Sequence, residues 1–522
     1  MRKQTEPSLA ASATKVSSAT AFSRILGLLR EQVMAYYFGA GMATDCFVAA
    51  FRIPNLLRDL FAEGALSSAF VPIFKDKLIK EGKDKAFHLA GLTISALILV
   101  VGIVVALGIL FTPALVFVSA KGFMSNPAKF ELTIVLTRIM FIYLLMVSIS
   151  AVFMGILNSS GKFGIPAMSP ALFNIGMILS PVILYNYFDI PIYTMALGVL
   201  IGGVGQLVFQ IPSLLNIGFR FKFIIRLADE GIRRIVRLIT PMILGLSASR
   251  INILINTLLA SLLIEGAISY LNFAYRLMHF PLGVFAVAVG TVALPKISGE
   301  VARNQIDQLT RIFYESLSLT MFLVIPSAVY LATFSDDLVR LIYERGAFGP
   351  EATSHTSFAL LFYALGLIGF AGVRVTAPAY YAMGDSKRPM QYSIFTVALN
   401  IGLNFAFIPI WGFAGLAAAT SVAGMLNFGL LLFNLRRKIP NLKFPGIFSG
   451  IIRMIMAAVT SYYIVSLIDF AAIFYNFEGI TGKILIVAGQ IAGMGIFYLI
   501  FSKILRLDET NRLLGLIFKR KQ

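Results

Sequence analysis

Four arginines lie within a largely apolar stretch that runs from Arg24 to Pro72. The stretch is long enough to form two membrane helices, yet it contains Arg24, Arg30, Arg52 and Arg58. An arginine at the centre of a membrane helix costs roughly 2.5–3.5 kcal/mol even on insertion-based scales. We therefore expect these side chains to face a wet or protein-lined interior rather than lipid. A cationic interior in turn fits an anionic ligand.

The composition indicates a polytopic membrane protein. Of 522 residues, 58% are hydrophobic and 13% are charged, whereas soluble domains carry about 25% charged residues. The single cysteine, Cys46, excludes a disulfide framework and a multi-thiolate metal site. The N-terminal residues have no apolar core followed by a cleavage site, so we expect a short cytoplasmic or interfacial lead-in without a cleaved signal.

Windows of about 20 apolar residues predict fourteen transmembrane helices. Their expected ranges are 16–38, 45–74, 87–113, 130–157, 165–187, 191–215, 236–262, 267–295, 312–334, 354–382, 389–409, 412–435, 448–470 and 480–503.

The distribution of basic residues supports an even number of spans. With both termini in the cytoplasm, the inner segments hold 31 of the 44 lysines and arginines and the outer segments hold 5. This asymmetry sets the orientation, because cytoplasmic loops carry the excess of basic residues. It also accounts for most of the net charge of +19 without nucleic-acid binding.

The remaining basic residues lie within the predicted spans, and all of them are arginines. Arginine presents a planar fork that binds phosphate oxygens in pairs and stays protonated. We expect Arg138, Arg250 and Arg374 to snorkel or to bond backbone carbonyls. The others are expected to line a central cavity, above all Arg24, Arg30, Arg58 and Arg276.

A weak internal repeat makes such a cavity plausible. Arg52 and Arg276 both follow an Ala-aromatic pair and are separated by 224 residues, and Pro72 and Pro295 are separated by 223. Asn174-Ile175-Gly176 matches Asn400-Ile401-Gly402 at an offset of 226. Parallel repeats of six helices each are typical of transporters that enclose a central site.

Enzyme and metal motifs are absent from the sequence. In the first two predicted spans the acidic residues are Glu31, Asp45, Asp59 and Glu63. The acidic pair Asp336-Asp337 is expected in an outer loop, and the three histidines, His88, His279 and His355, lie far apart in the chain. We therefore predict no catalytic residue, no metal site and no cofactor, and expect a membrane potential or an ion gradient to supply the driving force.

Small polar residues in the second half have two interpretations. Asn252, Asn256, Asn400, Asn404 and Thr420 could coordinate a sodium ion, or could hold helices together by hydrogen bonds. Because no carboxylate accompanies them, helix–helix bonding is favoured. The last two predicted spans lie outside the repeat and contain almost no charge, which suits packing or contact with a lipid tail.

Several segments closely resemble one transporter family over essentially the whole chain. They read FSRILGLLRE, FGAGMATDCFVAAFRIPNLLRDLFAEGALSSAFVPIF, NSSGKFGIPAMSPALFNIG and AYRLMHFPLGVFAVAVGTVALP. They are similar to the MurJ (MviN) lipid II flippases of the MOP exporter superfamily. The resemblance implies an all-α membrane protein with fourteen helices in two pseudo-symmetric six-helix lobes around a central cationic cavity. It also implies a groove for the polyprenyl tail, formed with the last two helices.

The resemblance divides the chain at 1–220, 221–440 and 441–522, the last being the two extra helices and a basic tail. It also implies the residues that bind substrate. Arg24, Arg30, Arg58 and Arg276 match the essential cavity arginines, Ser23 and Asp45 match further motif positions, and Glu31 fills a common acidic position. Arg52 and Asn55 complete the expected substrate-binding set.

The implied function is the transfer of lipid II from the cytoplasmic to the periplasmic leaflet of the bacterial inner membrane, by alternating access, for cell-wall synthesis. The expected partners are lipid II and membrane lipids, with other cell-wall synthesis proteins as candidates, and the expected state is a monomer. Two alternatives remain open here. A related polysaccharide or multidrug exporter is one, although an exporter of cations would need a carboxylate-lined site. A membrane-embedded polyprenyl-phosphate transferase is the other, and it would need metal-binding carboxylates.

Overall fold

The computed structural model describes the main chain of residues 9–59, 65–224, 226, 229–439, 444–477 and 479–511; of residues 9–17, 65, 241–249 and 444–445 it describes no side chain. Glu63, noted above, lies outside these ranges. The described residues form helices, turns and irregular segments without a β-strand. They group into two compact units, the first Met1–Ser269 with Arg345–Phe348 and the second Tyr270–Glu344 with Gly349–Gln522.

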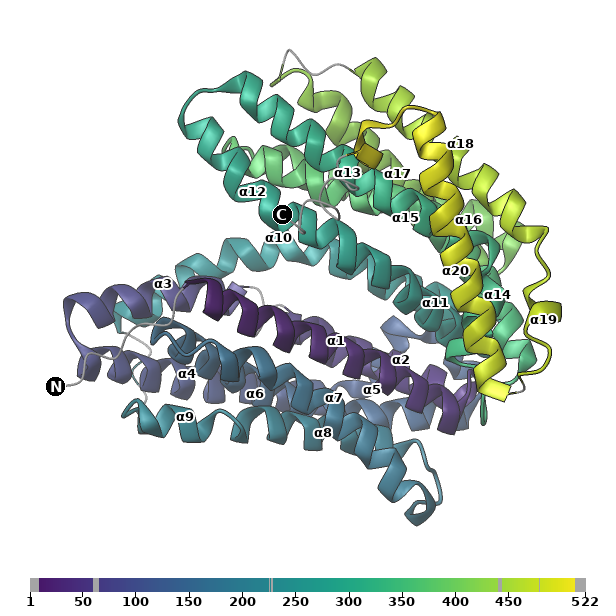
Figure 1. Cartoon of the computed structure of the whole chain (residues 1–522). Coiled ribbons are helices and arrows are strands. Elements are labelled where there is room, and N and C mark those ends of the chain that lie inside the picture. Colours follow the sequence, from purple (N-terminus) through teal and green to yellow (C-terminus); the bar gives the residue numbers. More distant parts are fainter. Residues whose placement is uncertain are drawn as a thin grey trace. The chain divides into compact units, whose positions relative to one another are not determined.

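The first unit is built from long helices with short helices between them (Figure 1). In chain order these are α1 (Leu9–Phe38), α2 (Met42–Arg58), α3 (Ala65–Lys80), α4 (Lys83–Leu110), α5 (Thr112–Ser119), η2 (Lys121–Ser125), α6 (Pro127–Ser159), α7 (Gly164–Leu184), η3 (Tyr185–Tyr187), α8 (Tyr193–Val208), α9 (Ile211–Asn216) and α10 (Glu230–Ser261).

The second unit contains the remaining helices, apart from the first three residues of α11 (Figure 1). They are α11 (Ala267–Pro281), the π-helix η4 (Leu282–Ala286), α12 (Val287–Ala302), α13 (Ile306–Thr333), α14 (Ser335–Ile342), α15 (Pro350–Ala382), α16 (Lys387–Trp411), α17 (Ala414–Leu435), α18 (Phe444–Ser466), α19 (Phe470–Ile473) and α20 (Gly479–Ile504).

Eleven helices, or helix pairs that run on from one another, are long and apolar enough to cross a membrane among the described residues. The predicted spans without such a counterpart are 16–38, 45–74 and 236–262, where the structure has α1, α2 with α3, and α10. These are the spans that carry most of the intramembrane arginines, and charge lowers their hydropathy. The count of fourteen stays a prediction.

The grouping by contacts differs from the division expected from the repeat. Helix α10 belongs to the first unit, where it packs against α3, whereas the repeat assigns it to the second half. Helices α18 and α20 belong to the second unit, where α18 packs against α13. The three-part division by sequence therefore remains a prediction about the membrane lobes.

Local sequence explains where the helices begin and how they pack. Helix α6 begins with Pro127, and the side chain of Asn126 caps it by accepting the main-chain N–H of Lys129 at 3.3 Å. In the pair α7 and α8, a Cβ added to Gly176 would lie 2.5 Å from the backbone of Gly202. Small residues at this crossing let the two backbones approach closely, as is common in membrane helices.

Hydroxyl groups inside the helices are satisfied locally. Thr93, Thr137 and Ser148 each donate to the carbonyl oxygen four residues earlier, at 2.7–2.8 Å. A polar group without a partner is costly where water is absent, so these bonds allow the hydroxyls to lie within apolar helices.

Candidate anion-binding site

Arg30 is held in place by residues of two helices in the first unit. On α1 it forms an ion pair with its buried neighbour Glu31. From α7, which packs against α1, the side-chain oxygen of Asn174 accepts a hydrogen bond from Nη1 of Arg30 at 3.2 Å. Nη1 of Arg30 also donates to the sulfur of Met177, likewise on α7, at 3.9 Å. Arg30 is thus oriented before any ligand arrives.

Asn174 connects two turns of α1. Its amide nitrogen donates to the main-chain oxygen of Ser23 at 3.2 Å, while its oxygen accepts from Arg30. Ser23, predicted from the resemblance to bind substrate, is therefore fixed through its carbonyl. Arg24, the next residue, is exposed on the same helix.

Asp59 lies between two arginines from different helices. Its Oδ1 is 3.0 Å from Nη2 of Arg58, and its Oδ2 is 2.8 Å from Nη1 of Arg250 on α10. The carboxylate itself is buried, whereas the side chain of Arg250 is 34% exposed. Arg250 was expected to snorkel or to bond a carbonyl oxygen, and the structure instead pairs it with this carboxylate.

Two further members of the predicted set lie on α2. Arg52 and Asn55 are both partly exposed, and the main-chain oxygen of Asn55 accepts the N–H of Asp59 where the helix ends. Whether either side chain contacts a ligand remains a prediction. Arg138 behaves as expected from the sequence, because its Nε donates to the carbonyl oxygen of Ile109 at 3.3 Å.

Asp45, also predicted to bind substrate, is occupied by groups of the protein. It is 1% exposed and forms an ion pair with Lys129 of α6 at 2.9 Å. Its two oxygens also accept the N–H of Gly266 at 2.9 Å, and the N–H and hydroxyl of Ser269 at 3.0 and 2.7 Å. A carboxylate at the start of a helix stabilises it through the exposed N–H groups and the helix dipole. Asp45 thus caps α11 and supports it rather than presenting a free carboxylate.

In the second unit, α11 carries Arg276 as an exposed side chain. Pro281 ends this helix, and the π-helical turn η4 follows at once. Proline removes the hydrogen bond to the carbonyl four residues earlier, and π-turns inside helices are frequent at functional sites. Arg276 therefore lies six residues before a local irregularity in the backbone.

The polar residues of α16 and α17 bond to one another. The Asn400 amide donates to the hydroxyl of Thr420 at 3.4 Å, and the Asn404 amide donates to the oxygen of Asn400 at 3.4 Å. The first of these bonds joins α16 to α17, as the helix-bonding interpretation predicts, and the second lies within α16. Asn252 and Asn256 lie on α10, in the first unit. Among the residues the structure describes there is no group of three His, Cys, Asp or Glu side chains suited to a metal ion.

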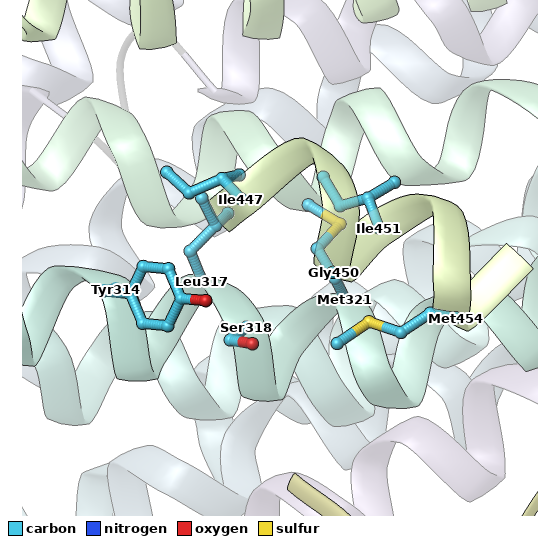
Figure 2. Close-up of a pocket in the computed structure, with 8 residues that line it drawn as sticks. All are labelled: Tyr314, Leu317, Ser318, Met321, Ile447, Gly450, Ile451 and Met454. Carbon is cyan, nitrogen blue, oxygen red and sulfur yellow. The ribbon is translucent and has the colours of Figure 1, made fainter. Parts of the chain in front are cut away.

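A small, mostly apolar pocket lies between α13 and α18 in the second unit. Figure 2 shows its lining from the two helices: Tyr314, Leu317, Ser318, Met321, Ile447, Gly450, Ile451 and Met454. Ser318 donates a hydrogen bond to the largely buried carboxylate of Glu509, beyond α20. The pocket has no cationic side chain, so it is distinct in chemistry from the arginine groups.

Three features of the site were not foreseen from the sequence. Lys129 precedes the predicted span 130–157 and was expected among the basic residues of the outer segments, but it is 7% exposed and neutralises Asp45. Asn174 was noted as part of the repeat alone, and the Arg250–Asp59 pair joins residues 191 positions apart in the chain. Pairing between distant residues depends on helix packing, which one sequence does not specify.

The chain is similar to a well-defined set of proteins. The model of the family described as lipid II flippase MurJ matches residues 34–484. The lipid II flippase MurJ of Burkholderia cenocepacia is 32% identical over 472 residues, which cover 90% of this chain and 91% of that protein. The probable lipid II flippase MurJ of Vibrio cholerae is 36% identical, with coverage of 80% and 81%.

Solved structures agree with the sequence comparisons. A lipid II flippase MurJ in an inward closed conformation matches with a TM-score of 0.79 and 29% identity, over 94% of this chain and 99% of that one. A multidrug resistance MATE family transporter of the MOP superfamily matches with a TM-score of 0.67 and 14% identity, over 82% of this chain and 98% of that one. At 14% identity, the match to the MATE family transporter shows a similar fold and nothing about function.

Proposed function

The chain belongs to the lipid II flippase MurJ family, and on this premise we propose that it moves lipid II across the membrane by binding the diphosphate on its intramembrane arginines. It is a multi-pass membrane protein of a transporter family. The substrate is lipid II, the lipid-linked precursor of the cell wall. The exporter and transferase alternatives are not favoured by the comparisons.

The observation that supports the arginine site is the pairing of three arginines of the first unit with acids that orient them. Glu31 holds Arg30, and Asp59 holds Arg58 and Arg250. Arg24, Arg30, Arg52, Arg58 and Arg250 outnumber Glu31 and Asp59 among the described residues, and Lys129 neutralises Asp45. The excess positive charge suits a diphosphate, and guanidinium groups bind phosphate oxygens in pairs.

The mechanism that we propose is alternating access. Arg30, Arg58 and Arg276 bind the diphosphate from the cytoplasmic leaflet, and Arg24 and Arg52 add positive charge. A conformational change then exposes the head group to the periplasmic side while the polyprenyl tail stays in lipid. A membrane potential acts on charge that moves in this step, at about 2.3 kcal/mol per charge per 100 mV.

The tail is proposed to follow the C-terminal helices. Helix α18 exposes Phe448, Ile452, Met456 and Val459, which recur at helical spacing along one side. Helix α20, which packs against α18, exposes Ile480, Ile484, Ile491 and Ile496. A polyprenyl chain needs such an apolar surface and no polar partner.

The remaining parts of the proposal concern chemistry and orientation. Flipping breaks no covalent bond, so we propose no catalytic residue and no cofactor. Both termini are proposed to lie in the cytoplasm, in agreement with the distribution of basic residues. We propose that the protein acts as a monomer in the inner membrane.

The test is the appearance of lipid II at the surface of bacteria in which this protein is the sole flippase. Arg30→Ala, Arg58→Ala and Arg276→Ala are compared with the wild-type protein at matched membrane levels. Each truncation removes charge-assisted hydrogen bonds of about 1.5–3 kcal/mol, so flipping should fall about 10- to 100-fold. Arg138→Ala is the matched control, because Arg138 bonds a carbonyl oxygen, and it should retain activity.

The outcomes test two questions separately: whether the protein transports lipid II, and whether the three arginines bind it. If the inserted wild-type protein leaves lipid II inside the cell, the proposed function is wrong. If the wild-type protein flips lipid II and all three variants do so as well, the function stands and the arginine site is wrong. Loss of the folded variants from the membrane would instead assign these arginines a structural role.

A further inference from the structure

His279 is a histidine within a membrane helix that the proposed mechanism does not use. It follows Arg276 by three residues on α11, so the two side chains lie on the same side of the helix. The imidazole is partly buried, and its Nδ1 atom is fully buried without a hydrogen-bond partner among the described residues. A buried ring nitrogen without a partner calls for an explanation.

The surroundings of the ring are aromatic and cationic. The ring centroid of Tyr275 is 4.1 Å from that of His279, and Tyr363 of α15 packs against Tyr275 at 5.6 Å. The charged groups that act on the imidazole are Arg276 on its own helix and Arg374 on α15. Within the described part of the chain, no carboxylate is among them.

This environment makes the charge of the ring depend on an anion. Histidine titrates within the physiological range, and a third positive charge beside two arginines is repelled. Without an anion, the neutral form of the ring is therefore favoured. An anion held by Arg276 would compensate the added charge and would offer oxygen atoms to an imidazolium N–H.

We propose that His279 takes up one proton when the diphosphate of lipid II binds beside Arg276, so that substrate binding is linked to proton uptake. This inference rests on the proposed function. The proton comes from the solvent and binds the free ring nitrogen, and it returns to solvent when the substrate leaves. No covalent bond is made or broken.

The internal repeat supplies a matched comparison. Arg276 corresponds to Arg52 at an offset of 224, and the same offset makes Asn55 the counterpart of His279. Asparagine is polar but does not titrate, so the first half has no equivalent proton-binding group at this position.

The experiment is a calorimetric titration of the purified full-length protein in lipid nanodiscs. The probe is lipid II with a shortened prenyl chain, whose diphosphate is a diester without a group that titrates near neutral pH. Titrations at pH 7.5 in buffers of different ionisation enthalpy give the number of protons taken up on binding. The wild-type protein should take up between about half a proton and one proton, and its affinity should rise up to tenfold for each unit by which the pH is lowered towards that at which free His279 is protonated.

The His279→Asn variant should bind the probe without proton uptake and with an affinity that does not change with pH. His279→Gln is the second variant if the first does not fold. His355→Asn is the control, because His355 packs against the rings of Tyr270 and Phe413, and it should take up protons as the wild-type protein does.

Each result bears on the inference. Binding by the wild-type protein without proton uptake would overturn it and leave the proposed function intact. Uptake that persists in both His279 variants would overturn it as well. If the wild-type protein does not bind the probe at all, the proposed function itself is wrong.

Discussion

The carboxylate of Asp45 bonds the main-chain N–H and the hydroxyl of Ser269, at 3.0 and 2.7 Å, across 224 residues of chain. The same offset separates Arg52 from Arg276, so Asp45 and Ser269 occupy equivalent positions of the internal repeat. A reciprocal contact lies beside it, because the main-chain N–H of Met42 donates to Glu265 at 3.2 Å. Asp45, on α2, thus caps the beginning of α11. Glu265, just before α11, caps the beginning of α2.

Asp45→Asn should lower the free energy of unfolding. We do not expect it to remove a direct contact with lipid II. The substitution leaves Lys129 buried without its counter-ion, and breaking one member of a buried pair costs about 3–5 kcal/mol. Thermal unfolding of the purified variant in detergent measures the loss. The double variant Asp45→Asn with Lys129→Met should recover part of it, since no buried charge remains.

One result would instead support the substrate-binding role of Asp45 that the family resemblance implies. If Asp45→Asn unfolds at the wild-type temperature but no longer binds lipid II, the carboxylate contacts substrate. In that case its bonds to Lys129 and Ser269 must open during transport.

The helices could largely be predicted from the sequence, because apolar length and basic loops are local signals. The predicted spans 130–157 and 354–382 correspond to α6 and α15, and the short helices between spans, such as α14, were not predicted. Helix α14 is a short helix of eight residues in an outer segment, where Asp336 accepts from Arg340 at 2.7 Å. Such a segment has no apolar run to reveal it.

The site could be predicted by residue type but not by contact. The sequence singled out Arg30 and Arg58 because a charged side chain in an apolar helix is costly. It could not show that Asn174 holds Arg30, or that Arg250 shares Asp59, since these pairs join helices far apart in the chain. Asp45 is the clearest example of a contact that the sequence could not predict. Its position in the chain does not reveal that its oxygens already bond Lys129 and Ser269.

Asn174→Ala should weaken the binding of lipid II while leaving the fold intact. Asn174 orients Arg30 through its oxygen and fixes the backbone of Ser23 through its nitrogen. Loss of one partner of such hydrogen bonds costs about 1–3 kcal/mol, which corresponds to roughly a 5- to 100-fold effect on binding. Binding of lipid II to the purified protein is the measurement.

Ser23→Ala is the control for this prediction. The contact that fixes Ser23 is made by its main-chain oxygen, which alanine retains, so binding should stay within about twofold of wild type. A loss of binding in Ser23→Ala that equals the loss in Asn174→Ala would show instead that the hydroxyl touches the substrate.

Asp385 should contribute stability at neutral pH that disappears in acid. Its carboxylate accepts from Lys438 at 2.9 Å and from the main-chain N–H of Arg388, and these bonds lower its pKa below the usual 3.8. A lowered pKa in the folded state stabilises the protein above the pKa of the unfolded chain, and the contribution is lost as the pH falls through the folded-state value. Asp385 lies between α15 and α16, where it caps the start of α16.

Asp385→Ala should therefore lower the unfolding free energy by about 1 kcal/mol at pH 7, as for the loss of a helix cap. The difference from wild type should shrink below about pH 3.8 and vanish at lower pH. Denaturant unfolding in mild detergent at a series of pH values is the measurement. A difference that stays constant down to pH 2 would mean that the carboxylate charge contributes nothing.

Arg250→Ala should weaken the binding of lipid II although Arg250 is not expected to contact it. In the wild-type protein, Asp59 divides its charge between Arg58 and Arg250, at 3.0 and 2.8 Å. Without Arg250, the carboxylate compensates Arg58 alone, and the local positive charge available to a diphosphate falls by one. We expect a loss of about 3- to 10-fold in affinity, which corresponds to roughly 0.7–1.4 kcal/mol.

The double variant Arg250→Ala with Asp59→Asn distinguishes charge from packing. It restores the formal charge around Arg58, so the affinity should return towards the wild-type value if charge is the cause. Arg138→Ala controls for the removal of any arginine from a span and should bind normally. If the double variant binds as weakly as Arg250→Ala, Arg250 acts by holding α10 against the end of α2, and its charge has no part in recognition.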